Sequence, residues 1–146
     1  MLNYILIAHL LGATIWTGGH LILALVILPK ALASRNVEVL LQFEEPFEKI
    51  GMPALGVQII TGLWMAYQLL PNIGSWFTLD NDLSVLISLK LLLLLLTFLV
   101  ALHARFYMIP KLSADTLKAF SVNITLVTSF SVAFVIVGTL FRTGFG

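Results

Sequence analysis

The sequence contains no cysteine and few charged residues. The absence of cysteine excludes disulfides, thiolate metal sites, iron–sulfur clusters and covalently attached c-type haem. Charged residues make up only 10% of the chain, whereas a soluble domain typically carries about 25%. Such a composition cannot cover a surface that faces water. Any metal or cofactor in this protein must therefore be held by His, Met, Lys, carboxylate or backbone groups.

Little net charge is present either. The formal net charge is +1 on 146 residues, which gives no electrostatic field able to attract nucleic acid. We therefore expect no nucleic-acid partner. The length suits a single domain and leaves no room for a second one.

Long apolar segments are abundant in place of charge. Hydrophobic residues make up 60% of the chain, and a helix needs about 20 mostly apolar residues to cross a bilayer. Proline follows the first three apolar segments closely, as expected at helix ends. The sequence predicts an all-α integral membrane four-helix bundle, up-down-up-down, surrounded by the lipid bilayer. The predicted helices span about residues 2–28, 53–70, 83–109 and 120–141.

Basic residues are unevenly divided between the two ends of these predicted helices. One end carries six of them: Lys30, Arg35, Lys49, Arg105, Lys111 and Lys118. The other end carries only Lys90 and Arg142. The positive-inside rule places the richer end in the cytoplasm, so both termini are expected on the outer side of the inner (cytoplasmic) membrane. Residues 31–49 are then expected to form a cytoplasmic loop, with a short interfacial helix interrupted by Pro46.

Three histidines fall within the predicted membrane segments, where polar side chains are expensive and commonly functional. His9 and His20 are eleven residues apart, which returns them to nearly the same helix face. His20 lies nine residues before Pro29, and His103 lies seven before Pro110. This match in depth predicts His20 and His103 as axial ligands of a haem b. The alternative is a structural role, in which each imidazole forms a hydrogen bond to a neighbouring helix.

Several weaker candidates accompany the histidines. Met65 lies at a depth comparable to His9, and the two could hold a second haem in the outer half. Lys90 either snorkels to the outer headgroups or serves the same site as His9. Arg105 is expected to be a topology anchor or a partner for a haem propionate. Trp16 is expected either to pack in the core or to contact a cofactor.

Two stretches carry a family resemblance. The stretch HLLGATIWTGG, from His9 to Gly19, and the Leu-rich segment from Lys90 to Leu112 resemble copper-resistance D (CopD) proteins and the related HemJ-type membrane proteins. The HemJ likeness implies haem b binding and protoporphyrinogen oxidation, with His9 and Lys90 as the positions that carry over. The CopD likeness implies copper handling across the cytoplasmic membrane. The chain departs from HemJ after Trp16, where a plain aliphatic run and His20 stand in place of a basic, aromatic-rich run.

Three functions follow as hypotheses. The first is a haem b redox protein with one haem or two, exchanging electrons with a quinone or porphyrin; if it is an enzyme, it is an oxidoreductase. The second is a copper-binding or copper-transporting protein, because thioether and imidazole together suit cuprous copper. The third is a structural subunit of a larger membrane complex, or a homo-oligomer. The candidate metal ligands are His9, His20 and His103, joined for copper by Met52, Met65 and Met108.

Overall fold

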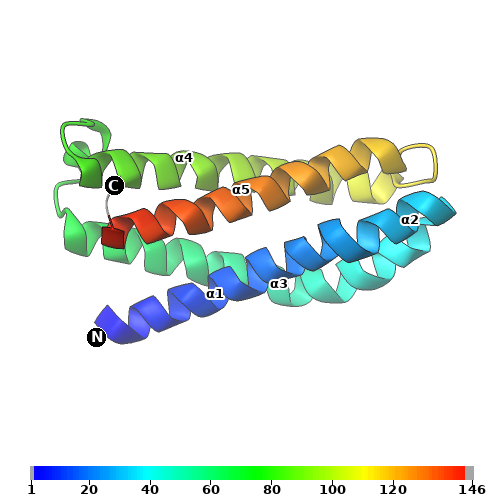
Figure 1. The fold of residues 1–146 in the computed structure, drawn as a ribbon, viewed down its shortest axis with the longest axis horizontal. Coiled ribbons are helices and arrows are strands. Elements are labelled where there is room, and N and C mark those ends of the chain that lie inside the picture. Colours follow the sequence, from blue (N-terminus) through cyan, green and yellow to red (C-terminus); the bar gives the residue numbers. More distant parts are fainter. Residues whose placement is uncertain (1, 144–146) are drawn as a thin grey trace.

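Four long helical rods make up the computed structural model, which describes residues 2–143 (Figure 1). The first rod joins α1 (Leu2–Ile22), a π-helical segment (Leu23–Ile27) and α2 (Leu28–Ser34). The second rod is α3 (Val37–Leu69). A 3₁₀ turn (Ile73–Phe77) leads into the third, which joins α4 (Asp82–His103), a π-helical segment (Ala104–Met108) and a 3₁₀ turn (Ile109–Lys111). The fourth rod is α5 (Leu117–Thr143).

Each rod is long and apolar enough to cross a membrane. The four candidate spans are 25 to 33 residues long, with mean hydropathy between 1.3 and 2.8, and about 20 residues suffice to span the hydrocarbon core. Large apolar side chains such as Leu25, Ile60 and Phe106 are exposed on the outside of the bundle. Such a surface is stable when it contacts lipid. The prediction of an all-α, multi-pass membrane bundle is therefore confirmed.

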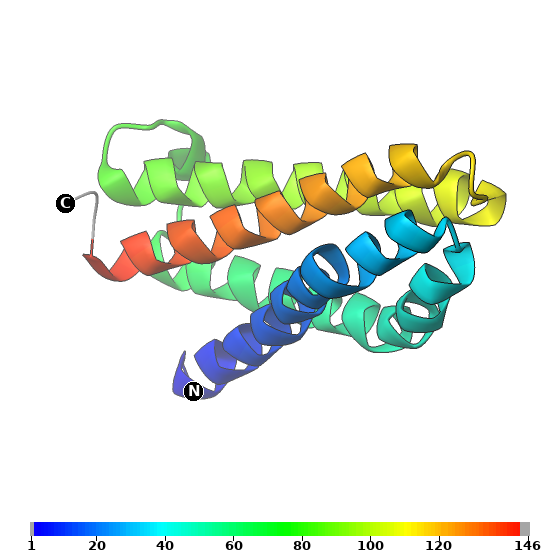
Figure 2. The ribbon, with the colours of Figure 1, turned by 45° about the vertical axis from the view of Figure 1, so that its right-hand side comes forward.

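Consecutive rods run antiparallel, which is the expected up-down-up-down order. Figure 1 shows both ends of the described chain at the same end of the bundle as the connection between α3 and α4. The first rod packs along α3, α4 packs along α5, and α1 also contacts α5. Figure 2 shows α1 leaning away from α5 toward its N-terminal end. Which end faces the cytoplasm stays a prediction, and the side chain of Arg142 lies outside the described part.

The second predicted helix was placed too late in the chain. It was expected to begin at Pro53 after a loop, but α3 begins at Val37 and continues through Pro46 and Pro53. The reversal before it takes only two residues: Arg35 adopts a left-handed φ of 53°, and the Asn36 side chain caps α3. Proline removes one ladder hydrogen bond at each site. Packing of the apolar stripe of this segment, which buries Leu40 completely, stabilises the helix despite that loss.

Pro29 was expected to end the first rod, but the rod continues for five more residues. A π-helical segment, Leu23–Ile27, immediately precedes it, and the Leu28 N–H bonds to the Leu23 carbonyl five residues earlier. This wider turn shifts the backbone hydrogen-bond pattern of the helix just before Pro29. Proline has no N–H to donate, and in a regular α-helix its ring would clash with a carbonyl of the preceding turn. The helix therefore passes Pro29 and ends at Ser34.

The third rod repeats this arrangement at Pro110. A π-helical segment, Ala104–Met108, precedes it, and the Ile109 N–H bonds to the Ala104 carbonyl. Here the chain adds only one 3₁₀ turn, ending at Lys111. Wide turns of this kind are frequent at functional sites because they re-aim the side chains around them.

The interior of the bundle contains an unusual number of polar side chains. Nine are buried among the described residues: His9, Thr17, His20, Gln58, Ser84, Thr97, Asn123, Thr128 and Ser131. Polar groups inside a membrane protein need partners there, since lipid offers none. Their positions therefore guide the search for a functional site.

Candidate metal site beside His20

The buried imidazole of His20 is fixed in one tautomer. Its Nδ1 lies 2.7 Å from the backbone carbonyl oxygen of Trp16, one helical turn earlier. A carbonyl oxygen can only accept, so Nδ1 carries the hydrogen and Nε2 keeps its lone pair. This is the arrangement typical of metal-binding histidines, in which one ring nitrogen is anchored and the other is the ligand.

Two aromatic rings pack against the imidazole. The Trp16 ring lies 4.4 Å from it, centroid to centroid, and the Phe47 ring meets it edge-on at 5.3 Å. Phe47 comes this close because Gly19 has no side chain; a Cβ there would collide with the Phe47 ring. The orientation of His20 is therefore set by packing as well as by its hydrogen bond.

Hydrogen bonds tie this part of α1 to α5. The Trp16 indole Nε1 donates to the Ser131 hydroxyl oxygen at 3.0 Å. The Thr128 hydroxyl donates chiefly to the Ile124 carbonyl at 2.7 Å and makes a longer, shared contact of 3.3 Å with the His20 backbone carbonyl. The Ser131 hydroxyl in turn donates to the Val127 carbonyl at 2.7 Å. These contacts fix the depth and rotation of α1 where its imidazole faces the interior.

Replacing Trp16 with phenylalanine is expected to lower the free energy of unfolding by about 1 kcal/mol, because an aromatic ring remains but the bond to Ser131 is lost. Thermal unfolding in detergent measures the change. Trp64→Phe is the control, since Trp64 is exposed on α3. Equal losses in the two variants would show that the indole hydrogen bond contributes nothing.

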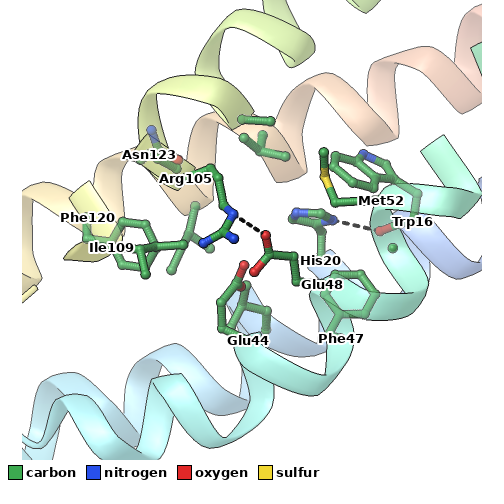
Figure 3. A pocket seen from close by; sticks show the side chains of 16 residues that line it. Trp16, His20, Glu44, Phe47, Glu48, Met52, Arg105, Ile109, Phe120 and Asn123 are labelled. Carbon is green, nitrogen blue, oxygen red and sulfur yellow. Dashed lines mark hydrogen bonds and ion pairs between the residues drawn. The ribbon is translucent and has the colours of Figure 1, made fainter. Parts of the chain in front are cut away.

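A cavity of about 50 Å³ lies next to His20 (Figure 3). We call it the His20 cavity. Its polar and sulfur-bearing lining consists of Trp16, His20, Glu44, Glu48, Met52, Arg105 and Asn123. Both π-helical segments also contribute to its wall, through Leu23 and Ala104. The volume suits an ion with one or two water molecules.

The charges in the His20 cavity do not balance. Arg105 Nε lies 2.5 Å from Glu48 Oε1, and this ion pair is partly shielded because the Glu48 side chain is only 23% exposed. Glu44 lines the same wall, one helical turn before Glu48. Two carboxylates thus face one guanidinium, which leaves a formal excess of one negative charge when both are ionised. Such a site favours a cation.

Met52 adds a soft ligand to this wall. Its thioether lines the cavity, and Figure 3 shows it beside the rings of His20 and Trp16. Glu44, Glu48 and Met52 are spaced four residues apart, so they form one stripe along α3. Imidazole, thioether and carboxyl groups therefore all occur in the lining of the His20 cavity.

The family model of copper resistance protein D (CopD) matches residues 41–143. The chain belongs to the CopD family. The matched region includes the walls of the His20 cavity on α3, α4 and α5, whereas His20 itself precedes it. No curated protein and no solved structure matches the chain.

In this CopD protein, His103 does not face His20. Its side chain is exposed and stacks on Tyr107 with the ring centroids 5.7 Å apart. The face of the third rod that lines the His20 cavity is formed by Ala101, Ala104 and Arg105. At about 100° per residue, position 103 points away from that face. The expected axial pair is therefore wrong in its geometry, because matched depth says nothing about rotation around the helix axis.

His9 forms a separate polar site in the other half of the CopD bundle. Its Nδ1 lies 3.1 Å from the Gln58 carbonyl oxygen and 2.9 Å from the Thr61 hydroxyl oxygen, which itself donates to a backbone carbonyl. Nδ1 is thus the donor, and Nε2 again keeps its lone pair. Gly62 makes room for the ring. Met65 lies half-buried on α3, one turn after Thr61, and its pairing with His9 stays a prediction.

Lys90 points toward aromatic rings of α5. Its ammonium nitrogen lies 4.5 Å from the Phe134 ring centroid and 5.4 Å from that of Phe141. Contacts of this kind stabilise a cation that has left water. These contacts account for a lysine at this position. A shared functional site of Lys90 and His9 stays a prediction.

Within residues 2–143, no group of three or more His, Asp or Glu side chains gathers in a metal-binding cluster. The three histidines thus do not form one site. The residues beside His20 do not fit a haem either, because ligand pockets for molecules smaller than haem already measure roughly 300–1,000 Å³ and this cavity measures about 50 Å³.

Proposed function

We propose that this CopD-family protein binds cuprous copper in the His20 cavity as the ion moves into or through the membrane. The family match supports a copper-related role. The observation that carries the proposal is the Nε2 of His20, which has no hydrogen-bond partner within residues 2–143 and lines the same cavity as the Met52 thioether and the Glu44 and Glu48 carboxyl groups. Copper is the cargo in this proposal.

The ligand types favour Cu⁺ over harder cations. Thioether sulfur and neutral imidazole are soft ligands, and together they select cuprous copper over Mg²⁺ or Ca²⁺. The face of the Trp16 indole lies next to the same imidazole, and an aromatic face attracts cations. A site with few ligands is sufficient, because the cavity has room for an ion rather than for a large complex.

The carboxyl groups of the His20 cavity and its opening on the outside of the bundle support access by a cation. Met52 and Arg105 line the cavity and are also exposed, so the site reaches the surface of the protein on that side. Glu44 and Glu48 supply the cavity with carboxyl groups, and Arg105 pairs with Glu48. When both carboxyl groups are ionised, the net negative charge attracts cations.

A copper titration tests the proposal. The purified protein in nanodiscs is titrated anaerobically with Cu⁺ against a chromophoric chelator, and Zn²⁺ is titrated in parallel. We expect one Cu⁺ per chain and much weaker Zn²⁺ binding. Absence of Cu⁺ binding, or equal affinity for the two ions, would refute it.

The absorbance of the same preparation tests the haem hypothesis. A haem b protein shows a Soret band that sharpens and shifts on reduction, whereas the copper proposal predicts a colourless preparation that binds Cu⁺. A haem spectrum would instead favour the hypothesis that this protein exchanges electrons with a quinone or porphyrin. Oligomeric state and location in the inner membrane stay predictions.

A further inference from the structure

Trp16 also lines a second cavity. It measures about 10 Å³, and the indole of Trp16 forms part of the wall of both cavities. Each of the four rods contributes one buried polar residue to it: Thr17 from α1, Gln58 from α3, Thr97 from α4 and Ser131 from α5. All four are 9% exposed or less. We call this the Gln58 cavity.

Gln58 carries a polar atom without a partner. Its Oε1 is fully buried and accepts no hydrogen bond from any residue in the described part of the chain. Lipid cannot supply a donor at this depth, and an unpaired acceptor in such surroundings is costly. The remaining wall is apolar, formed by Leu55, Leu94 and Phe134 together with the Trp16 ring. Gln58 therefore needs a donor from a molecule inside the cavity.

The hydroxyls around the cavity are suited to the same molecule. Thr17 and Thr97 make no hydrogen bond to other residues in the described range 2–143. Ser131 already donates to Val127 and accepts from Trp16, so it offers only a remaining lone pair. The site thus presents acceptors and rotatable hydroxyls in a space close to that of one water molecule, which needs about 10–15 Å³.

We propose that the Gln58 cavity binds one water molecule, which donates to Gln58 Oε1 and hydrogen-bonds to the hydroxyls of Thr17 and Thr97. A bound cation does not suit this cavity, because every lining residue is neutral and a bare charge in low dielectric requires a counter-charge. The water joins α1, α3 and α4 at one point, through the side chains of Thr17, Gln58 and Thr97. The inference is independent of copper binding in the His20 cavity.

The sign of a threonine-to-valine substitution tests this inference. Thr97→Val keeps the shape of the side chain and removes only the hydroxyl. If water is bound, the variant loses a hydrogen bond, and its Tm falls by about 2–4 °C. If the cavity is dry, the variant replaces an unpaired hydroxyl by a methyl group, and its Tm rises or stays the same. Unfolding is followed by circular dichroism in one detergent.

The same substitution in a Gln58→Met background provides the second arm. Methionine fills the space and removes the acceptor, so the water is displaced and Thr97→Val no longer lowers Tm. An equal fall in both backgrounds would contradict the proposal.

Thr125→Val on the exposed side of α5 is the matched control, with an expected change of about 1 °C or less. If Gln58→Met does not fold, Thr17→Val replaces it, and a rise or no change in Tm overturns the inference.

Discussion

His20→Ala is expected to weaken Cu⁺ binding by about 100-fold or more. The substitution removes the imidazole whose Nε2 is free while its Nδ1 donates to the Trp16 carbonyl. Loss of a residue that merely orients a ligand already costs about 10–100-fold in metal affinity, and loss of the ligand costs more. The measurement is the anaerobic chelator competition described above.

His103→Ala is the matched control for this prediction. It removes the same side chain from the third rod, where the imidazole is exposed and stacks on Tyr107. We expect its Cu⁺ affinity to equal that of the unmodified protein. Met52→Leu should fall between the two, because a soft ligand is lost and the volume is kept. An equal loss in His103→Ala and His20→Ala would show that copper is held outside the His20 cavity.

Gly12→Ala is expected to destabilise the bundle by about 1–3 kcal/mol, which is the usual cost of overpacking. Gly12 lies where α1 packs against α3, and a Cβ there would lie only 2.8 Å from the Ala54 backbone carbonyl oxygen. A backbone oxygen cannot swing aside as a side chain can. The two helices must therefore separate, which also disturbs His9 and Trp16 on the same face. Thermal unfolding in detergent measures the loss.

Gly18→Ala is the matched control on the same helix. No heavy atom lies within 4 Å of the position that its Cβ would take. In a helix interior alanine is favoured over glycine by about 1 kcal/mol, so this variant should be as stable as the unmodified protein or more stable. Equal destabilisation of the two variants would mean that α1 and α3 do not pack closely at Gly12.

The four membrane spans could be predicted from the sequence because crossing a bilayer imposes a simple requirement. A run of about 20 apolar residues is visible without any knowledge of neighbours. The ends of the rods were harder to predict. Pro29 and Pro110 are normally stop signals, but the π-helical turns before them let each rod continue. The residues next to Pro29 and Pro110 do not by themselves predict such a turn.

The candidate site was only half predictable, for a geometric reason. Depth along a helix can be counted from its ends, and His20 is buried inside the bundle on a helix long enough to cross a membrane. Rotation about the axis needs a reference face, and the pairing with His103 had none. The stripe of Glu44, Glu48 and Met52 could have been found from its spacing of four residues. The charged residues and Pro46 within residues 31–49 are typical of a loop, and they conceal the helical spacing of this stripe.

X-ray absorption at the copper edge, on the Cu⁺-loaded protein in nanodiscs, tests the central claim most directly. The account predicts a nitrogen scatterer from one imidazole together with a sulfur scatterer. Met52→Leu should remove the sulfur signal, and His20→Ala should remove the imidazole signal. A spectrum with oxygen and nitrogen neighbours only, unchanged in both variants, would contradict copper binding in the His20 cavity.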